Sequence, residues 1–402
     1  MYKIADKLFA PDDPKLGEAL ASIYGTSQRP LCLCRAQGVE MYIAKIGKQY
    51  HIKRMPYSGA SHAVMCDSYE PPAELSGLGE VMGGAIQTNL TDGVTSLKFD
   101  FALSKNGSRQ APAPAASEAD SVRTDGKKLT LRGTLHYLYD EAGLTRWSPA
   151  MQGKRSWRVV RKYLLQAAAD KVAKGAPVAE LMFVPEAFSL DMKDELTRRR
   201  LAVFNALAQS NGSTRRLMLL IGEVKEIGDA RFGKKLVVKH MSDAPFMVND
   251  DLYKRLLKRF EHEFGLWSAS ESSHLLVVAT FGVSGAGVPS IEEASLMLVN
   301  EHWLPYESLD EKLLLDALVE QKRRFTKGLR YNLATTVPLA STVLSDTAEP
   351  VAMYLTPFGA TDDYRRQLAE LTGESSLLSW QWDTSEEMPA LPSVGLQRPT
   401  DR

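Results

Sequence analysis

Two short stretches, Cys32-Leu33-Cys34 and His62-Ala63-Val64-Met65-Cys66, decide how the first part of this chain folds. They hold all three cysteines of the 402-residue sequence, together with one of its seven histidines. Three thiolates and one imidazole complete the tetrahedral shell of a zinc ion and leave no position for a catalytic water. We therefore predict a structural zinc site, with zinc as the cofactor, formed by Cys32, Cys34, His62 and Cys66.

The spacing within each stretch predicts how the four ligands meet. Cys32 and Cys34 are two positions apart, so on a β-strand both side chains leave the same face. His62 and Cys66 are four positions apart, so on a helix they share a face. Two other interpretations stay open, because free cysteines often only pack in a core and because reactive thiols can carry redox chemistry.

The composition is typical of a globular protein, with 44% hydrophobic and 24% charged residues. The length predicts about two to four domains. Because the formal net charge is zero, attraction to nucleic acid or membrane has to come from local patches. No apolar run approaches the ~18 residues that span a bilayer, so we expect no membrane partner. The first residues lack a signal pattern, and few cysteines fit a reducing compartment, so we expect a cytoplasmic protein.

Composition and periodicity predict a mixed α+β fold class with several domains. Residues 41–46 and 50–55 alternate as two strands of a hairpin. The segment 104–126 is rich in Ala, Pro and Ser, which predicts a linker. The predicted units are a zinc-binding N-terminal domain (1–103), the flexible linker (104–126), a basic helix-turn-helix-like module (127–180), a mixed α/β domain (181–300), a nuclease-like α/β unit (301–384) and a disordered tail (385–402).

The α/β units are read from apolar runs and helical periodicity. Beyond the basic module, strands are expected at 181–184, 217–224, 235–239, 275–281, 340–346 and 350–356, and helices at 191–209, 250–264, 308–324 and 362–372.

The segment 145–162 is the most basic part of the chain. Two helices, near 129–143 and 155–173, flank a glycine-bounded turn there, as in a helix-turn-helix or winged-helix module. Guanidinium groups bind phosphates and indole rings stack on bases. A solvated basic helix whose tryptophans pack inside is the alternative. We predict that nucleic acid, with DNA favoured, is contacted by Arg146, Trp147, Lys154, Arg155, Trp157, Arg158 and Arg161.

A second basic run, 321–332, follows the predicted helix at 308–324. Cations at the end of a helix interact favourably with its dipole. Five cations around two aromatic residues exceed that need, so we predict a second phosphate-binding groove. Its residues are Lys322, Arg323, Arg324, Lys327 and Arg330.

The C-terminal unit resembles the core of restriction-endonuclease-like folds, in which a helix glutamate, a strand aspartate and an E-x-K motif gather around a divalent metal. Glu311 and Asp346 match the first two positions, but Met353 and Tyr354 stand where the second acid is expected. The resemblance therefore implies a degenerate unit with no catalytic residues. A magnesium-dependent nuclease that uses Glu311, Asp346 and the triplet Glu223-Val224-Lys225 is the alternative function.

Motifs along nearly the whole chain resemble a family of uncharacterised proteins from bacterial plasmids and integrative conjugative elements. They include Cys32-Leu33-Cys34-Arg35, the His62-x3-Cys66 motif, and residues 143–147, 153–157, 222–226 and 325–332. The resemblance implies a bacterial cytoplasmic setting, where DNA and other mobile-element proteins are the partners. With the basic stretches, it predicts a non-catalytic DNA-binding accessory protein. A protein–protein scaffold of a larger complex is a further alternative.

Overall fold

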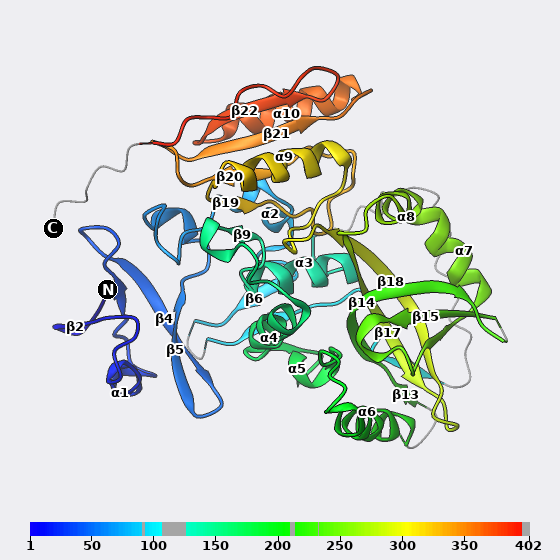
Figure 1. The fold of residues 1–402 in the computed structure, drawn as a ribbon. Helices are drawn as coiled ribbons and strands as arrows, with labels where there is room; N and C mark the ends of the chain where they lie inside the picture. Colours follow the sequence, from blue (N-terminus) through cyan, green and yellow to red (C-terminus); the bar gives the residue numbers. More distant parts are fainter. Residues whose placement is uncertain (91–92, 107–125, 210–213, 232, 396–402) are drawn as a thin grey trace.

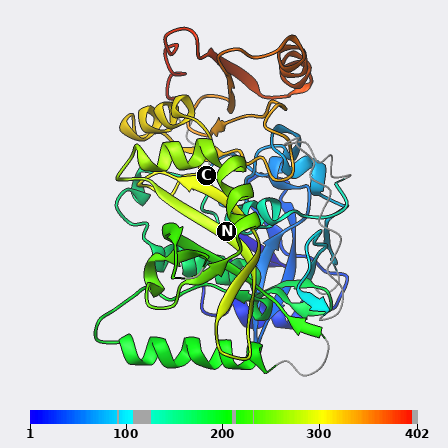
Figure 2. The ribbon, with the colours of Figure 1, turned by 90° about the vertical axis from the view of Figure 1, so that its right-hand side faces the viewer.

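The computed structural model describes residues 1–90, 93–106, 126–209, 214–231 and 233–395 (Figure 1). Within these residues the fold is mixed α+β, with ten α-helices, several sheets and one small closed barrel. The N-terminal sheet lies on one side of the molecule, the barrel on the other, and the C-terminal sheet along one end (Figures 1 and 2).

The N-terminal sheet has the order β2-β1-β3-β4-β5, and α1 packs on it. The predicted hairpin at 41–55 is confirmed, because β4 and β5 pair antiparallel from Met41–Arg54 to Ile46–Gln49. A small apolar core forms between Leu20 and Ile23 of the helix and Ile43 of the sheet. The elements are β1 (Tyr2–Ile4), β2 (Lys7–Phe9), α1 (Leu16–Ile23), β3 (Leu31–Cys32), β4 (Val39–Ile46) and β5 (Gln49–Arg54).

The middle of the molecule combines a four-stranded sheet with short helices. Its sheet has the order β11-β10-β7-β6. The helix α3 begins at Thr130, whose hydroxyl accepts a hydrogen bond from the amide of Gly133, and such a cap satisfies a free N–H group at the helix start. The elements are α2 (Leu78–Val81), β6 (Ile86–Thr88), β7 (Thr95–Leu97), α3 (Leu131–Glu141), α4 (Trp157–Ala168), β10 (Lys171–Ala173), β11 (Ala176–Pro177) and α5 (Val178–Leu181).

Five strands close into a barrel with the order β14-β15-β16-β18-β17 and back to β14. All neighbours are antiparallel except β16 and β18. In chain order, two helices lie between β16 and β17. This five-stranded Greek-key barrel has the topology of the OB-fold. Its elements are β14 (Met218–Asp229), β15 (Lys234–Val238), β16 (Phe246–Val248), α7 (Asp250–Arg259), α8 (Glu261–Ser268), β17 (His274–Val283) and β18 (Pro289–Val299).

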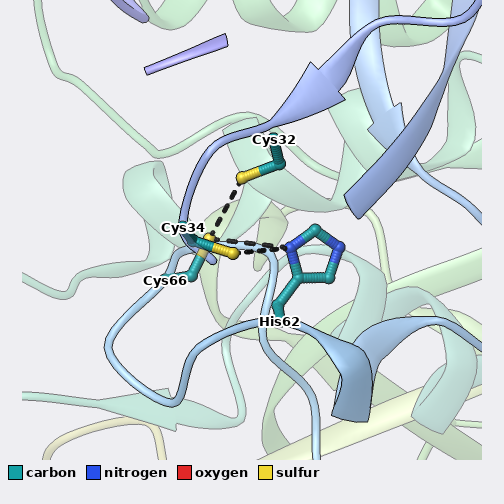
Figure 3. A group of neighbouring side chains, drawn as sticks. All are labelled: Cys32, Cys34, His62 and Cys66. Carbon is teal, nitrogen blue, oxygen red and sulfur yellow. Dashed lines mark hydrogen bonds between the residues drawn. The ribbon is translucent and has the colours of Figure 1, made fainter. Parts of the chain in front are cut away.

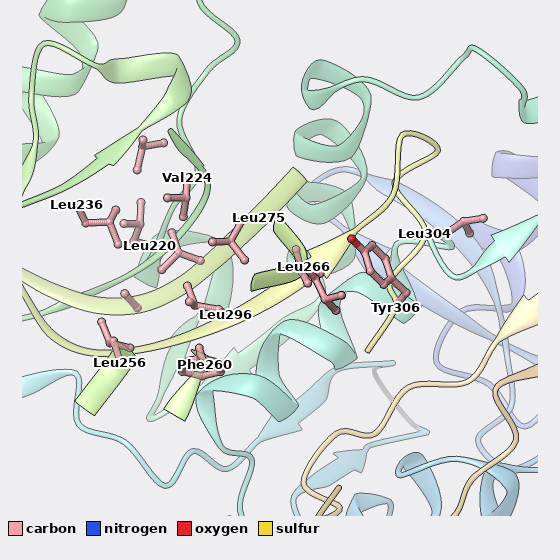
Figure 4. Packing of buried hydrophobic residues seen from close by; sticks show 14 of the residues in the cluster. Leu220, Val224, Leu236, Leu256, Phe260, Leu266, Leu275, Leu296, Leu304 and Tyr306 are labelled. Atoms are coloured by element: carbon pink, nitrogen blue, oxygen red, sulfur yellow. The ribbon is translucent and has the colours of Figure 1, made fainter. Parts of the chain in front are cut away.

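The strands β14, β17 and β18 carry buried apolar residues on both faces, because each face meets a different core. Leu220 and Val224 of β14 belong to the cluster that fills the barrel (Figure 4). Leu219 and Ile221 of the same strand belong to the cluster around α3 and α4. Strands buried on both faces read as continuous apolar runs rather than as alternation. Beside the barrel lie β12 (Met182–Phe183), which pairs with β14, α6 (Lys193–Ala208), and the two-stranded ribbon of β8 (Ser104–Asn106) and β13 (Thr214–Arg216).

The C-terminal sheet has the order β22-β21-β20-β19-β9, in which β21 and β22 are parallel and the other pairs antiparallel. The edge strand β9 belongs to the basic segment 145–162, far upstream in the chain. The elements are β9 (Arg146–Trp147), α9 (Leu309–Glu320), β19 (Phe325–Lys327), β20 (Thr342–Leu344), β21 (Val351–Thr356), α10 (Asp362–Glu374) and β22 (Leu378–Asp383).

The structure differs from the predicted division into separate modules. One apolar cluster runs from Trp147 to Trp382 and a second from Val81 to Tyr331, so both cross the boundaries expected at 180 and 300. The physical reason is strand pairing between distant parts of the chain. Within the expected helix-turn-helix-like module, β9 pairs with β19 and β10 pairs with β7. The helix α3 buries nearly all of its side chains against this body, which no free helix-turn-helix module does.

Residues 385–395 also differ from the expected disordered tail. The indole of Trp380 donates to the carbonyl of Ala390 at 3.0 Å, and the amide of Gly395 donates to the carbonyl of Asp346 at 2.9 Å. Of the linker expected at 104–126, residues 104–106 form β8, which pairs with β13. Residues 107–125 of that linker and the end of the tail at 396–402 lie outside the described residues. In the part of the chain that the structure describes, no helix is long and apolar enough to cross a bilayer.

Candidate metal centre and basic surfaces

The four predicted zinc ligands lie together, Cys32 at the end of a strand and the other three in turns (Figure 3). Cys32 ends β3 and Cys34 follows in a turn. His62 directly follows the helical turn Gly59–Ser61. The expected helix over 62–66 is wrong, because the chain turns instead, with the amide of Cys66 donating to the carbonyl of Ala63 at 2.8 Å.

The ligand atoms fit a tetrahedral metal. A zinc ion with Zn–S bonds of ~2.3 Å holds two sulfurs ~3.8 Å apart, and a sulfur and an imidazole nitrogen ~3.6 Å apart. The sulfurs of Cys32 and Cys66 are 3.6 Å apart, and Nδ1 of His62 lies 3.3 Å from the sulfur of Cys34 and 3.8 Å from that of Cys66. All four ligand atoms lie within 4.8 Å of one another. The group could therefore bind a zinc-like metal ion.

Backbone groups support the sulfurs. The amide of Ala63 donates to the sulfur of Cys34, and that of Ser68 donates to the sulfur of Cys66, both at 3.4 Å. Arg35 joins the two ligand segments, since its guanidinium donates to the carbonyls of Ser61 at 2.8 Å and His62 at 3.2 Å. Such outer contacts orient metal ligands.

The protonation states also suit a cation. Burial raises the pKa of the Cys32 thiol to about 12, so a positive ion is needed to hold this sulfur as a thiolate at neutral pH. Burial lowers the pKa of His62, and the guanidinium groups of Arg54 and Arg35 add to this effect. The imidazole is therefore neutral, which is the form that binds metal.

The loop that carries Cys66 is bonded to the body of the molecule. Arg146 of β9 donates to the carbonyl of Asp67, next to Cys66, and lies 3.2 Å from the carboxylate of Glu70. Glu70 also pairs with Arg54 of β5 at 2.5 Å. The loop that carries Cys66 thus holds the N-terminal sheet and the C-terminal sheet together through one carboxylate.

A family model described as "Protein of unknown function (DUF1173)" matches residues 2–385. The chain belongs to the DUF1173 family. No curated protein and no solved structure matches it.

In this DUF1173 chain the first basic stretch is only partly on the surface. Trp147 and Trp157 are buried, and the indole of Trp157 donates to the carbonyl of Pro185 at 2.8 Å. Arg155 donates to the carbonyls of Leu144 and His302 at 2.8 and 3.3 Å. In these positions the side chains bond to the backbone of the protein itself. The predicted contact residues that remain exposed are Lys154 and Arg158, with Arg146 and Arg161 half-buried.

The second basic stretch lies mostly inside, which corrects the expected groove. The guanidinium of Arg323 is buried and makes two bonds to Asp346, at 2.8 and 3.1 Å. Lys327 lies 3.0 Å from Glu311, and Arg330 lies 2.7 Å from Glu307. Each of these buried cations is paired with an acid of the same unit, so its charge is already compensated within the protein. The exposed members of this set are Lys322 and Arg324.

The acids expected in a nuclease are engaged in these same contacts. Glu311 accepts a hydrogen bond from Ser341 at 2.6 Å in addition to its contact with Lys327. Glu223 lies 2.7 Å from the ammonium of Lys239 and 2.8 Å from Nδ1 of His274. Burial opposes its ionisation, but His240 at 3.6 Å and the hydrogen bonds with His274 and Lys239 outweigh that effect and hold the pKa of Glu223 well below its usual range.

Sequence reasoning missed the partners of these charges. His240 reaches Glu223 through the pairing of β14 with β15, and His274 reaches it through the pairing of β14 with β17 that closes the barrel. The rings of His240 and His274 stack on Trp157 and Trp303 at centroid distances of 5.7 and 4.3 Å. No spacing rule gives such contacts, because they join separate strands and helices.

Proposed function

We propose that this DUF1173 protein is a non-catalytic nucleic-acid-binding protein, with DNA as the ligand, whose N-terminal sheet is stabilised by a structural zinc ion. The observation that carries the proposal is the exposed basic surface formed by α4 and the turn that precedes it. Residues 142–169 contain six cations and no acid, and Lys154, Arg158 and Lys162 are exposed.

This face suits a polyanion for an electrostatic reason. Arg158 and Lys162 are one helical turn apart, and like charges at this spacing repel. No ion pair joins any of the three exposed cations to an acid of the described chain. A row of phosphates would replace this repulsion by attraction and would release counterions. The barrel adds support, since OB-folds commonly bind oligonucleotides or oligosaccharides.

Replacing Lys154, Arg158 and Lys162 together by alanine is expected to weaken binding to every DNA sequence alike. The slope of log affinity against log salt should fall by ~0.9 for each duplex phosphate contact that is lost. Fluorescence anisotropy of labelled DNA over a salt series measures both effects.

The matched control replaces Lys254, Arg255 and Lys258 of α7, which are also exposed. It removes the same charge from a helix that begins with two aspartates. We expect this variant to bind like the wild type. An equal loss in both variants would mean that only the total charge matters and would count against α4 as the site.

The remaining parts of the proposal follow from the other motifs. The donor set of three sulfurs and one imidazole supports zinc over harder metals. The order of α9, β19, β20, β21, α10 and β22 supports reading the C-terminal unit as a degenerate restriction-endonuclease-like domain, whose acids are occupied by cations. The family motifs support a role on a bacterial mobile element, in the cytoplasm, alongside other proteins of that element.

A further inference from the structure

The segment 184–188 runs along the basic helix and is fixed to it. The guanidinium of Arg161 donates to the carbonyl of Val184 at 3.0 Å, and the indole of Trp157 donates to that of Pro185 at 2.8 Å. Both donors lie on α4, on the turn that carries the exposed cation Arg158. The backbone of the segment is therefore fixed beside the proposed DNA-binding face.

The same segment is fixed at its far end. Glu186 pairs with Arg199 of α6 at 3.2 Å, and the amide of Phe188 donates to Nδ1 of His240 at 3.3 Å. His240 in turn stacks on Trp157. In Figure 1, α4, α5 and α6 follow one another along this edge of the molecule.

Despite these anchors, the ring of Phe188 points away from the cores. The residue is 52% exposed and belongs to none of the buried clusters of the described chain. Exposing a phenyl ring to water costs free energy that burial would recover. An exposed ring on a segment whose backbone is bonded to α4, together with the exposed cations of that helix, offers both of the contacts that a single strand requires, which are a stacking surface and a positive charge for the backbone.

We propose that Phe188 and the exposed cations of α4 form a binding site for single-stranded nucleic acid, with the ring of Phe188 stacking on an unpaired base. This inference rests on the proposed function and specifies the form of its ligand. Bases within a duplex are already stacked on their neighbours, so the ring gains a partner only where a base is unpaired. The tryptophans that the sequence offered for stacking are buried, so an exposed ring has to provide the stacking surface, and Phe188 is more exposed (52%) than Tyr163 of α4 (42%).

The test compares a labelled oligothymidylate with a duplex of equal length, using the full-length protein. Stacking of one base on an aromatic side chain contributes enough that Phe188→Ala should weaken binding to the single strand on the order of five- to a hundredfold. Binding to the duplex should stay at the wild-type level, and Phe188→Trp should retain single-strand binding because an indole ring also stacks.

Phe358→Ala is the matched control, since this phenylalanine is 85% exposed and its amide is likewise bonded to a side chain, that of Thr384. It should bind both probes like the wild type. Wild-type affinity of Phe188→Ala for oligothymidylate, or an equal loss for both probes, would overturn the inference while leaving the proposed function intact. A wild-type protein that binds neither probe would overturn both.

Discussion

Replacing Cys66 by serine should abolish metal binding and loosen the N-terminal sheet. We expect the purified protein to contain one zinc ion per chain and the variant to contain much less, because serine offers no thiolate. Structural zinc sites in small domains contribute ~10–16 kcal/mol of apparent binding free energy. The apolar core of the N-terminal sheet is small, so it cannot compensate for a loss of that size. Elemental analysis gives the zinc content.

The loosening should be local. Hydrogen exchange should speed up in residues 31–35 and 59–70, while the barrel strands keep their protection, since none of the four ligands belongs to the barrel core. The neighbour Met65 is 49% exposed, so Met65→Ser is a matched control that should keep both zinc and protection. A wild-type protein free of zinc, or a Cys66→Ser variant that still binds one equivalent, would rule out the site.

The grouping of Cys32, Cys34, His62 and Cys66 in space was predictable because residue type alone carries most of the information. Three cysteines and a histidine in one region specify a set of donor atoms, and this set does not depend on the local secondary structure. The helix expected for His62 and Cys66 was wrong, because a spacing of four fits a helix and a pair of tight turns equally well. Hydrogen bonds from Ala63 and Ser68 to the sulfurs favour the turns, and no spacing rule reports those bonds.

The elements with a strong local pattern were also predictable. The hairpin of β4 and β5, the strands β14, β15, β17 and β21 and the helices α6, α9 and α10 all lie close to the expected ranges. The strand β18 was missed because Glu292 and Glu293 interrupt its apolar pattern, next to a register shift opposite Thr280 and Phe281. Closure of the barrel depends on pairing between distant strands, which local periodicity does not specify.

The basic stretches show the limit of reading charge from sequence. In a sequence, a cation that binds phosphate cannot be distinguished from a cation that neutralises an acid of the same chain, because the sequence does not show which acid lies beside it. Arg323, Lys327 and Arg330 have partners 16 to 23 residues away in the chain. In the first stretch, α4 at least has a helical period that separates the buried Trp157 and Val160 from the exposed Arg158 and Lys162.

Replacing Arg323 by methionine is therefore expected to destabilise the C-terminal sheet strongly. Only 1% of this arginine is exposed, and its guanidinium bonds to both carboxylate oxygens of Asp346 and to the carbonyl of Pro392 at 2.7 Å. Removing one member of a buried ion pair leaves the other charge without compensation and costs ~3–5 kcal/mol. A lower midpoint of thermal or urea unfolding, followed by tryptophan fluorescence, measures the loss, since Trp380 and Trp382 lie in the same sheet.

The next residue in the chain is the natural control. Arg324 is exposed, and only its backbone amide bonds to Asp346, at 2.8 Å, so Arg324→Met should unfold at nearly the wild-type midpoint. Comparing the two variants separates an arginine that stabilises the fold from an arginine that binds phosphate at the surface, which the sequence alone does not distinguish. If Arg323 acted at the surface on phosphate, its replacement would weaken DNA binding and spare stability. A stable Arg323→Met variant would thus contradict the buried pairing with Asp346, whereas a large loss of stability beside an unaffected Arg324→Met would assign Arg323 to the architecture of the sheet.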